Sequence, residues 1–209
     1  VLAEKILETI KAPFELNSKK IFTEASIGIA IFPDNGEDAE TMLKGADIAM
    51  YVAKDKGGNS FAFFSEEMNR KALESRQMEL DLRRALDKSE FFLAYQVQWD
   101  LRSNRIVGAE ALLRWNHPEK GLVPPDQFIP LAEETGLIEP IGDWVLRTAC
   151  KQNKIWQKAG YSPIRVAVNL SAHQLRQNDF VGLVDQVLQE TGLDPCWLEL
   201  ELTESILMN

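Results

Sequence analysis

Three polar side chains lie inside segments that are otherwise apolar and typical of β-strands. They are Glu110, Asn169 and Glu201. Two carboxylates and an amide oxygen are ligands that a hard divalent cation, Mg²⁺ or Mn²⁺, prefers. Burying a carboxylate in a strand is unfavourable unless a positive charge compensates it. The pattern therefore predicts either a cation site at these three residues or ordinary buried ion pairs of the glutamates with Arg114 or Lys154, and spacing alone favours neither.

The segments around these residues alternate between strand and helix. A strand–helix–strand order favours a parallel sheet, and active sites form at the carboxyl ends of such strands. The nearly continuous apolar run at 164–170 is typical of a strand covered on both faces. Glu204 falls just after the last expected strand, so it would belong to a loop and could position that loop rather than bind a metal. Strands are expected at 91–98, 105–115, 164–170 and 197–203, and helices at about 126–135, 139–159 and 179–191.

The N-terminal third of the chain has a different order of elements. Residues 19–32 are rich in β-formers, and Asp38 can cap a helix that follows it. Residues 65–86 carry charges of both signs and few apolar positions, which is typical of a solvated connecting helix. We therefore expect three parts: an N-terminal part at 1–64, a connecting helix at 65–86 and a C-terminal part at 87–209.

Composition and charge exclude several functional classes. Of the 209 residues, 45% are hydrophobic and 26% are charged, as in a soluble globular protein rather than a disordered chain. The 23 basic residues are outnumbered by 32 acidic ones, giving a net charge of −9, so a broad basic surface for DNA or RNA is not expected. No apolar stretch is long enough for a membrane span, so no membrane contact is expected of this segment. His117 and His173 have no second ligand at metal-binding spacing and are interpreted as surface histidines.

Short motifs follow one another along nearly the whole chain. In the C-terminal part they are AYQ at 94–96, EALLRW at 110–115, FIPLAEETG at 128–136, NLS at 169–171 and ELTE at 201–204. In the N-terminal part they are SIGIA at 26–30, AD at 46–47, MY at 50–51 and AK at 53–54. The first set resembles the first half of an EAL-type cyclic di-GMP phosphodiesterase domain. The second set resembles the end of a GGDEF-type diguanylate cyclase domain.

The resemblance implies an α/β fold, a partial TIM-like (β/α) barrel of the EAL type preceded by the C-terminal part of an α+β GGDEF domain. It also implies metal-dependent hydrolysis of cyclic di-GMP to the linear dinucleotide pGpG, with Mg²⁺ or Mn²⁺ as cofactor. By that resemblance the metal ligands are Glu110, Asn169 and Glu201. The catalytic residues are Glu110, Glu201 and Glu204, and Glu204 stabilises the loop that completes the site. The substrate contacts are Gln96, Leu112 and Arg114.

The sequence departs from the two families in ways that affect these expectations. Val97 stands where the EAL family usually has proline. The chain starts after the signature GGDEF loop and stops before the paired aspartates, the lysine and the later glutamate that the EAL family uses, so the fragment itself is expected to be inactive in both reactions. A whole barrel of this type takes about 250 residues, so we expect an open sheet edge that a longer polypeptide or a second copy in a homodimer covers.

Two alternative functions stay open for the longer protein. A non-catalytic receptor would bind cyclic di-GMP without a working general base. A barrel glycosidase could use two strand-end glutamates as acid and nucleophile, and it would need no metal. For the preferred function, cyclic di-GMP is the expected partner and the bacterial cytoplasm the expected location, with a possible sensory or membrane region upstream in the parent protein.

Overall fold

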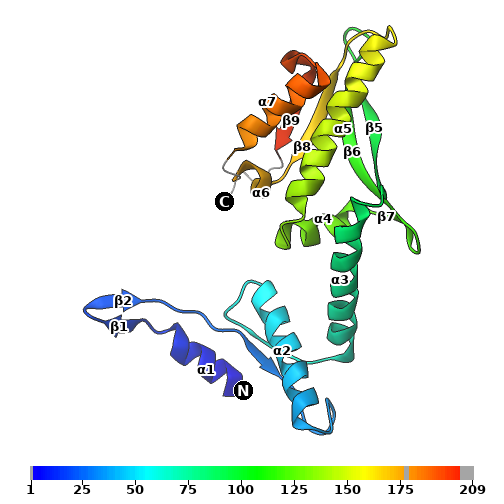
Figure 1. Cartoon of the computed structure of the whole chain (residues 1–209). Coiled ribbons are helices and arrows are strands. Elements are labelled where there is room, and N and C mark those ends of the chain that lie inside the picture. The colour runs from blue at the N-terminus through cyan, green and yellow to red at the C-terminus, as the bar shows by residue number, and fades with distance from the viewer. Residues whose placement is uncertain (1, 177–178, 203–209) are drawn as a thin grey trace. The chain divides into compact units, whose positions relative to one another are not determined.

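The computed structural model describes residues 2–176 and 179–202 (Figure 1). The chain divides into two compact units, residues 1–77 and 78–209. The boundary falls inside one continuous helix, α3 (Glu66–Ala85). The three-part division into 1–64, 65–86 and 87–209 stays a prediction.

The first unit is built around a strand–helix–strand motif. Two short strands pair in parallel, and a long helix connects them. An antiparallel pair of strands and an N-terminal helix precede this motif. The elements are α1 (Leu2–Lys11), β1 (Phe14–Leu16), β2 (Lys19–Ile21), β3 (Ile27–Ile29), α2 (Ala39–Asp55) and β4 (Phe61–Phe63).

Two local features explain the position of α2. Its first turn is capped by Asp38, whose Oδ1 accepts a hydrogen bond from the Thr41 backbone N–H at 2.8 Å, as the sequence predicts. On its inner side, α2 lies against the glycine of β3, because a Cβ atom at Gly28 would lie 1.8 Å from the Ala46 carbonyl oxygen. Glycine at position 28 therefore allows the strand backbone to touch the helix.

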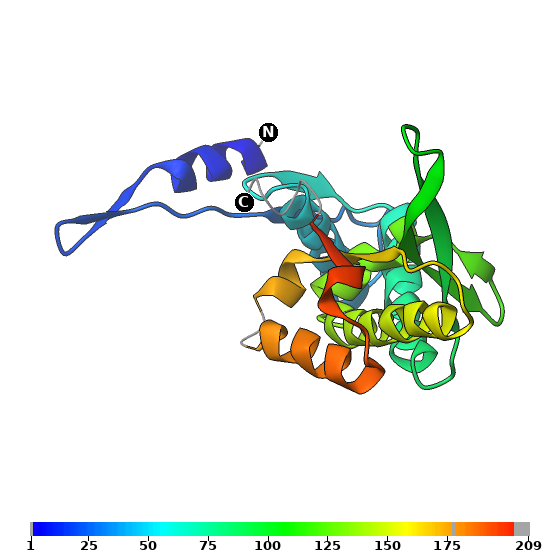
Figure 2. The same ribbon diagram turned by 90° about the horizontal axis from the view of Figure 1, so that it is seen from above.

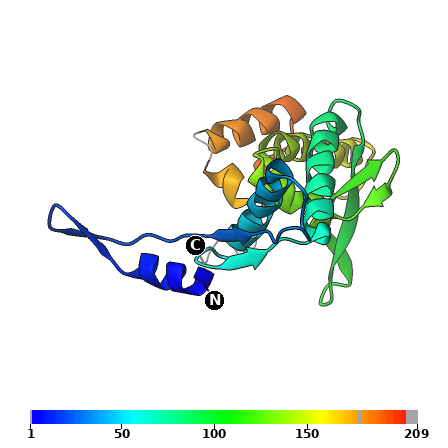
Figure 3. The same cartoon turned by 90° about the horizontal axis from the view of Figure 1, so that it is seen from below.

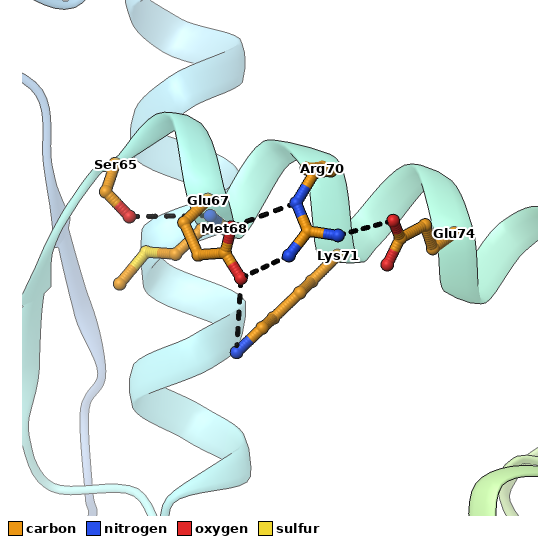
Figure 4. Close-up of polar contacts among 6 residues, drawn as sticks. All are labelled: Ser65, Glu67, Met68, Arg70, Lys71 and Glu74. Atoms are coloured by element: carbon orange, nitrogen blue, oxygen red, sulfur yellow. Dashed lines mark hydrogen bonds and ion pairs between the residues drawn. The ribbon is translucent and has the colours of Figure 1, made fainter.

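The first half of α3 is held by exposed ion pairs (Figure 4). Arg70 donates from Nε to Glu67 Oε2 at 2.9 Å and from its NH1 group to Glu74 Oε1 at 2.6 Å. Lys71 Nζ lies 3.6 Å from Glu67 Oε1. Every residue from 70 to 77 is exposed, and exposed ion pairs of this kind contribute little to the free energy of unfolding.

The second half of α3 is part of the second unit. Leu82 and Ala85 are fully buried in its core, so the expectation of a wholly solvated helix is wrong for this half. Asp81 contacts Arg84, and its Oδ2 lies 3.2 Å from Nε2 of the buried His117. Nδ1 of His117 accepts two backbone N–H groups of the following turn, each at 3.1 Å, so Nε2 carries the hydrogen and donates it to Asp81. The interpretation of His117 as a surface residue is therefore wrong, because the end of its strand packs against α3.

A five-stranded mixed sheet forms the centre of the second unit. The hydrogen-bonded order is β5-β6-β8-β9, and β7 pairs with the end of β6. β5 and β6 run antiparallel as a long ribbon (Figure 3), whereas β6, β8 and β9 are parallel. The strands are β5 (Phe91–Asp100), β6 (Arg105–His117), β7 (Gly121–Val123), β8 (Arg165–Leu170) and β9 (Leu198–Leu202).

Helices connect the parallel strands and cover one face of this sheet. α5 and α7 lie side by side against that face (Figure 2). The three helices expected at 126–135, 139–159 and 179–191 are confirmed to within one residue at each end. The helices are α4 (Pro125–Glu134), α5 (Ile138–Lys158), α6 (Ala172–Leu175), α7 (Phe180–Thr191) and the 3₁₀ turn Pro195–Trp197. No helix in the described ranges is long and apolar enough to span a membrane.

The core of the second unit lies between the sheet and these helices. Trp115, Val166 and Val168 point from the strands into it and are at most 1% exposed. Arg165 and Asn169, which lie on β8 together with Val166 and Val168, are exposed. The expectation that this strand is covered on both faces is therefore wrong at Arg165 and Asn169, because alternate side chains point to opposite faces and the helices cover only one. Ala167, between them on the open face, is nevertheless 0% exposed. The strands that the structure describes form an open sheet and do not close into a barrel.

Candidate functional site

The uncovered face of the sheet carries the predicted site residues. The pairing register decides which side chains are neighbours on that face. Glu110 on β6 lies opposite Gln96 on β5 and opposite Ala167 on β8, two residues before Asn169. Asn169 in turn lies opposite Glu201 on β9. Three neighbouring parallel strands therefore bring Glu110, Asn169 and Glu201 to one face, toward the carboxyl ends of β8 and β9.

Glu110 and Asn169 are in direct contact. Asn169 Nδ2 donates a hydrogen bond to Glu110 Oε1 at 2.7 Å. Asn169 is exposed, and Glu110 and Glu201 are half-buried. The expectation that both carboxylates are buried in core strands is therefore wrong. They lie on the face that no described helix covers, where an uncompensated charge costs less than it would in the core.

Ordinary ion pairs do not account for the two glutamates. Within residues 2–176 and 179–202, neither Glu110 nor Glu201 forms a salt bridge with a lysine or an arginine. Arg114 instead donates from its NH1 group to the Leu113 carbonyl oxygen at 2.8 Å. The face therefore keeps two carboxylates whose charge no described basic side chain neutralises at contact distance.

Neighbouring negative charge acts on Glu201. Partial burial raises the pKa of Glu201 above its ordinary value, and the charges of Glu110 and Glu199 raise this pKa further. A hydrogen bond from the Gln98 side chain opposes the shift.

The oxygen atoms on this face fit a hard divalent cation. Glu110, Asn169 and Glu201 offer carboxylate and amide oxygens, and a cation would relieve the repulsion that raises the pKa of Glu201. In the part of the chain that the structure describes, no three His, Cys, Asp or Glu side chains gather as a metal site. A cation bound here would therefore depend on the Asn169 amide as well, with its oxygen turned toward the ion.

A cavity of about 240 Å³ lies at the carboxyl ends of β6 and β8. Leu112, Arg114 and Asn169 line it, and its remaining walls are largely apolar side chains of α4 and α5. Glu133 on α4 is the carboxylate in its lining. Of the proposed substrate contacts, Leu112 and Arg114 thus meet at the cavity. Gln96 is exposed on β5 and does not line it.

Three residues that line the cavity were not predicted from the sequence. Ser171 and Gln174 line the cavity beside Asn169, and their Ser-x-x-Gln spacing is a capping-box pattern that could have revealed them. Glu133 lies in a motif that carries the family resemblance but has no signal of its own. Glu204 lies outside the described residues. His173 is exposed, as expected.

Two families match separate parts of the chain. The EAL domain family matches residues 79–209. The family described as "Diguanylate cyclase, GGDEF domain" matches residues 1–60. The two matches follow one another in the order that the motifs predict.

Known relatives have the same arrangement over almost the whole chain. The bifunctional diguanylate cyclase/cyclic di-GMP phosphodiesterase MucR of Pseudomonas aeruginosa is 44% identical over 99% of this chain and 30% of its own length. The cyclic di-GMP phosphodiesterase PdeR of Escherichia coli is 39% identical over 99% of this chain and 31% of its own length. The chain therefore spans less than a third of each of these relatives.

A solved structure supports a partial EAL-type fold. The PaMucR phosphodiesterase in complex with c-di-GMP is 45% identical, with a TM-score of 0.61 over 64% of this chain and 54% of that chain. The open sheet of the second unit corresponds to a part of such a domain.

Proposed function

The chain belongs to the EAL-domain family, and from this premise we propose that its protein hydrolyses cyclic di-GMP to the linear dinucleotide pGpG in bacterial second-messenger signalling. The observation that carries the proposal is the meeting of Glu110, Asn169 and Glu201 on one sheet face, where partial burial, and then the charges of Glu110 and Glu199, raise the pKa of Glu201. The names of MucR and PdeR support it. Because this chain spans less than a third of those relatives, the activity is proposed for a polypeptide of their length.

Glu110, Asn169 and Glu201 would hold Mg²⁺ or Mn²⁺. When bound, such a cation neutralises charge on the phosphodiester and lowers the pKa of a water molecule. The task of the three side chains is to hold the ion at a fixed place on the sheet. Hydrogen bonding between neighbouring strands fixes their spacing, and the contact of Asn169 with Glu110 at 2.7 Å brings two of them together. Glu204 would stabilise the loop that follows β9.

Arg114, Leu112 and Gln96 would bind the dinucleotide. The planar guanidinium group of Arg114 can donate two parallel hydrogen bonds to a phosphate or to a base edge. Its charge is not paired with a carboxylate in the described ranges, and it lines the cavity at the strand ends. Leu112 lies on the same face between Glu110 and Arg114 and would contact the ligand through apolar surface. Gln96, opposite Glu110, would reach the ligand from β5.

The proposed setting is the bacterial cytoplasm, in a protein that forms a homodimer. Among the strands described, the edge strand β9 has one unpaired side, which a second copy or further residues of a longer polypeptide would cover. Light scattering at increasing protein concentration tests the dimer. A monomer at every concentration would contradict it.

The central test is release of pGpG from cyclic di-GMP by a polypeptide that carries these residues and has the length of full MucR. With Mg²⁺ we expect turnover that EDTA abolishes and added metal restores, and that Glu110→Ala removes. Tight binding of cyclic di-GMP without turnover would contradict the phosphodiesterase function and favour a receptor function. EDTA-resistant cleavage of a glycoside would replace it by a glycosidase.

A further inference from the structure

The turn after Asn169 is held by a buried glutamine. The Ser171 backbone N–H donates to Gln174 Oε1 at 3.1 Å, and the Gln174 backbone N–H donates to Ser171 Oγ at 3.3 Å. Gln174 is 4% exposed and Ser171 is 9% exposed. This reciprocal capping box begins α6, a helix of only four residues. Stabilising one helical turn does not account for burying a glutamine side chain so deeply.

The side-chain amide of Gln174 packs against the backbone of α5 at Gly142. A Cβ atom at Gly142 would lie 2.0 Å from Gln174 Nε2 and 2.5 Å from its Cδ, so only glycine leaves room for the amide at this place. Gly142 is buried within α5, where glycine is less favourable than alanine for helix formation. The sequence thus has an unfavourable helix residue at the one position that the amide occupies.

We propose that Gln174 is a positioning residue for Asn169 and acts through Ser171. This proposal rests on the proposed function, in which Asn169 is a ligand of the cation. Ser171 follows Asn169 by two residues, and the side chain of Leu170 between them is 4% exposed, on the opposite face. With Leu170 buried and the Ser171 N–H bound to Gln174, the backbone at the end of β8 keeps one orientation. That orientation directs the Asn169 amide at Glu110.

A positioning role and a simple helix cap predict different results. Loss of a cap alone would lower the free energy of unfolding and leave cation affinity unchanged. A positioning residue would also change the environment of the Asn169 amide in the folded protein. It would weaken cation binding by about 10-fold to 100-fold, as the loss of groups that orient metal ligands does.

The test compares Gln174→Ala with the unchanged protein and with His173→Ala, an exposed neighbour on the same helix. The polypeptide is the one used for the turnover assay, labelled with ¹⁵N. In the metal-free protein we expect a shifted, exchange-protected side-chain amide signal of Asn169, which Gln174→Ala removes and His173→Ala keeps. Titration with Mn²⁺ alone should show at least about 10-fold weaker binding in Gln174→Ala.

Gly142→Ala breaks the same contact from the other side. Its methyl group would displace the Gln174 amide, so we expect the same loss of the Asn169 signal and of Mn²⁺ affinity. The double variant should be no worse than Gln174→Ala, because the amide is then absent and alanine suits the helix better. Additive losses in the double variant would show that Gly142 and Gln174 act separately, against the proposal.

The outcomes distinguish failure of the positioning role of Gln174 from failure of the proposed function. If Gln174→Ala folds and leaves both the Asn169 signal and the Mn²⁺ affinity unchanged, Gln174 does not position Asn169. If the unchanged protein neither binds Mn²⁺ nor turns over cyclic di-GMP, the proposed function fails, and the amide signal still decides whether Gln174 orients Asn169. Thermal unfolding of each variant confirms that the comparison is made between folded proteins.

Discussion

The two faces of the β5-β6-β8-β9 sheet have opposite properties, although the same strands build both. On the covered face, Trp115 and Val166 are 0% exposed and belong to the core between the sheet and its helices. On the open face, Glu110, Asn169 and Glu201 are partly or fully exposed, and the charges of Glu110 and Glu201 repel each other. Residues that are adjacent in the sequence therefore point to opposite faces, one of which forms the core and the other of which carries the proposed site.

The difference separates stability from chemistry within each strand. Apolar side chains on the covered face stabilise the fold in proportion to the surface that they remove from water. Carboxylates on the open face add little to folding, and Glu201 opposes it in its charged form because folding raises its pKa. A substitution on one face should thus change the free energy of unfolding, and a substitution on the other should change activity.

The largest effect is expected for Trp115→Ala on the covered face. Trp115 packs against Phe91 and Phe128, with ring centroids 5.8 and 5.5 Å away, and its Nε1–H donates to Glu90 at 3.1 Å. We expect a loss of about 3–5 kcal/mol in the free energy of unfolding, measured with chemical denaturant. Trp99→Ala, at a tryptophan that is 50% exposed, is the matched control and should change stability by about 0.5 kcal/mol or less. Equal losses in the two variants would contradict the role given to the covered face.

The next effect is expected for Glu110→Gln on the open face. Removing one proposed metal ligand should lower turnover of cyclic di-GMP by at least about 100-fold, or about 2.7 kcal/mol. The free energy of unfolding should stay constant or rise, since a repelling charge is lost. Glu119→Gln, at an exposed glutamate, is the control for both measurements. A large loss of stability in Glu110→Gln would mean that the two faces are not separate in this way.

A smaller effect is expected for Tyr95→Phe, which removes a polar atom from the covered face. The Tyr95 hydroxyl is buried and has no hydrogen-bond partner in the described part of the chain, and burial raises the pKa of Tyr95 to about 12. Because no hydrogen bond is lost, the free energy of unfolding should change by less than about 1 kcal/mol, in the stabilising direction if at all. A loss well above this value would reveal a partner of the hydroxyl, such as an ordered water.

The smallest effect concerns the titration of Glu201. Glu110→Gln should lower the pKa of Glu201 toward its ordinary value of 4.5, since one of the charges that raise it is removed. With a raised pKa in the folded state, the contribution of Glu201 to stability is present below pH 4.5 and is lost as the pH rises through the folded-state pKa. Cation binding should strengthen over the same rise, because protons and metal compete for the carboxylate. NMR titration of the Glu201 carboxyl carbon, without and with Mg²⁺, measures both effects. An unchanged pKa of Glu201 in Glu110→Gln would show that the charge of Glu110 does not act on Glu201.

Local patterns in the sequence predict the elements of the second unit well, and long-range contacts decide the rest. The helix ends were predictable to within one residue because periodicity is local. Glu110, Asn169 and Glu201 could be named as candidate metal ligands from the sequence because each interrupts an apolar strand. Their exposure was not predictable, since it depends on which faces other parts of the chain cover. The contacts of His117 with Asp81 and of Gln174 with the glycine of α5 join segments that are distant in sequence, and no local pattern signals them.

Helix α3 should show two rates of hydrogen exchange along one continuous element. From residue 70 to 77 its side chains are exposed and its ion pairs lie at the surface, where salt screens them over a Debye length of about 8 Å at physiological ionic strength. The turns around Leu82 and Ala85 are tied to the core. Amide protons of the first half should exchange with D₂O through local fraying, and those near Leu82 only when the whole second unit opens. Added salt should widen the gap between the two rates, because it weakens the surface pairs and leaves the apolar anchor in place.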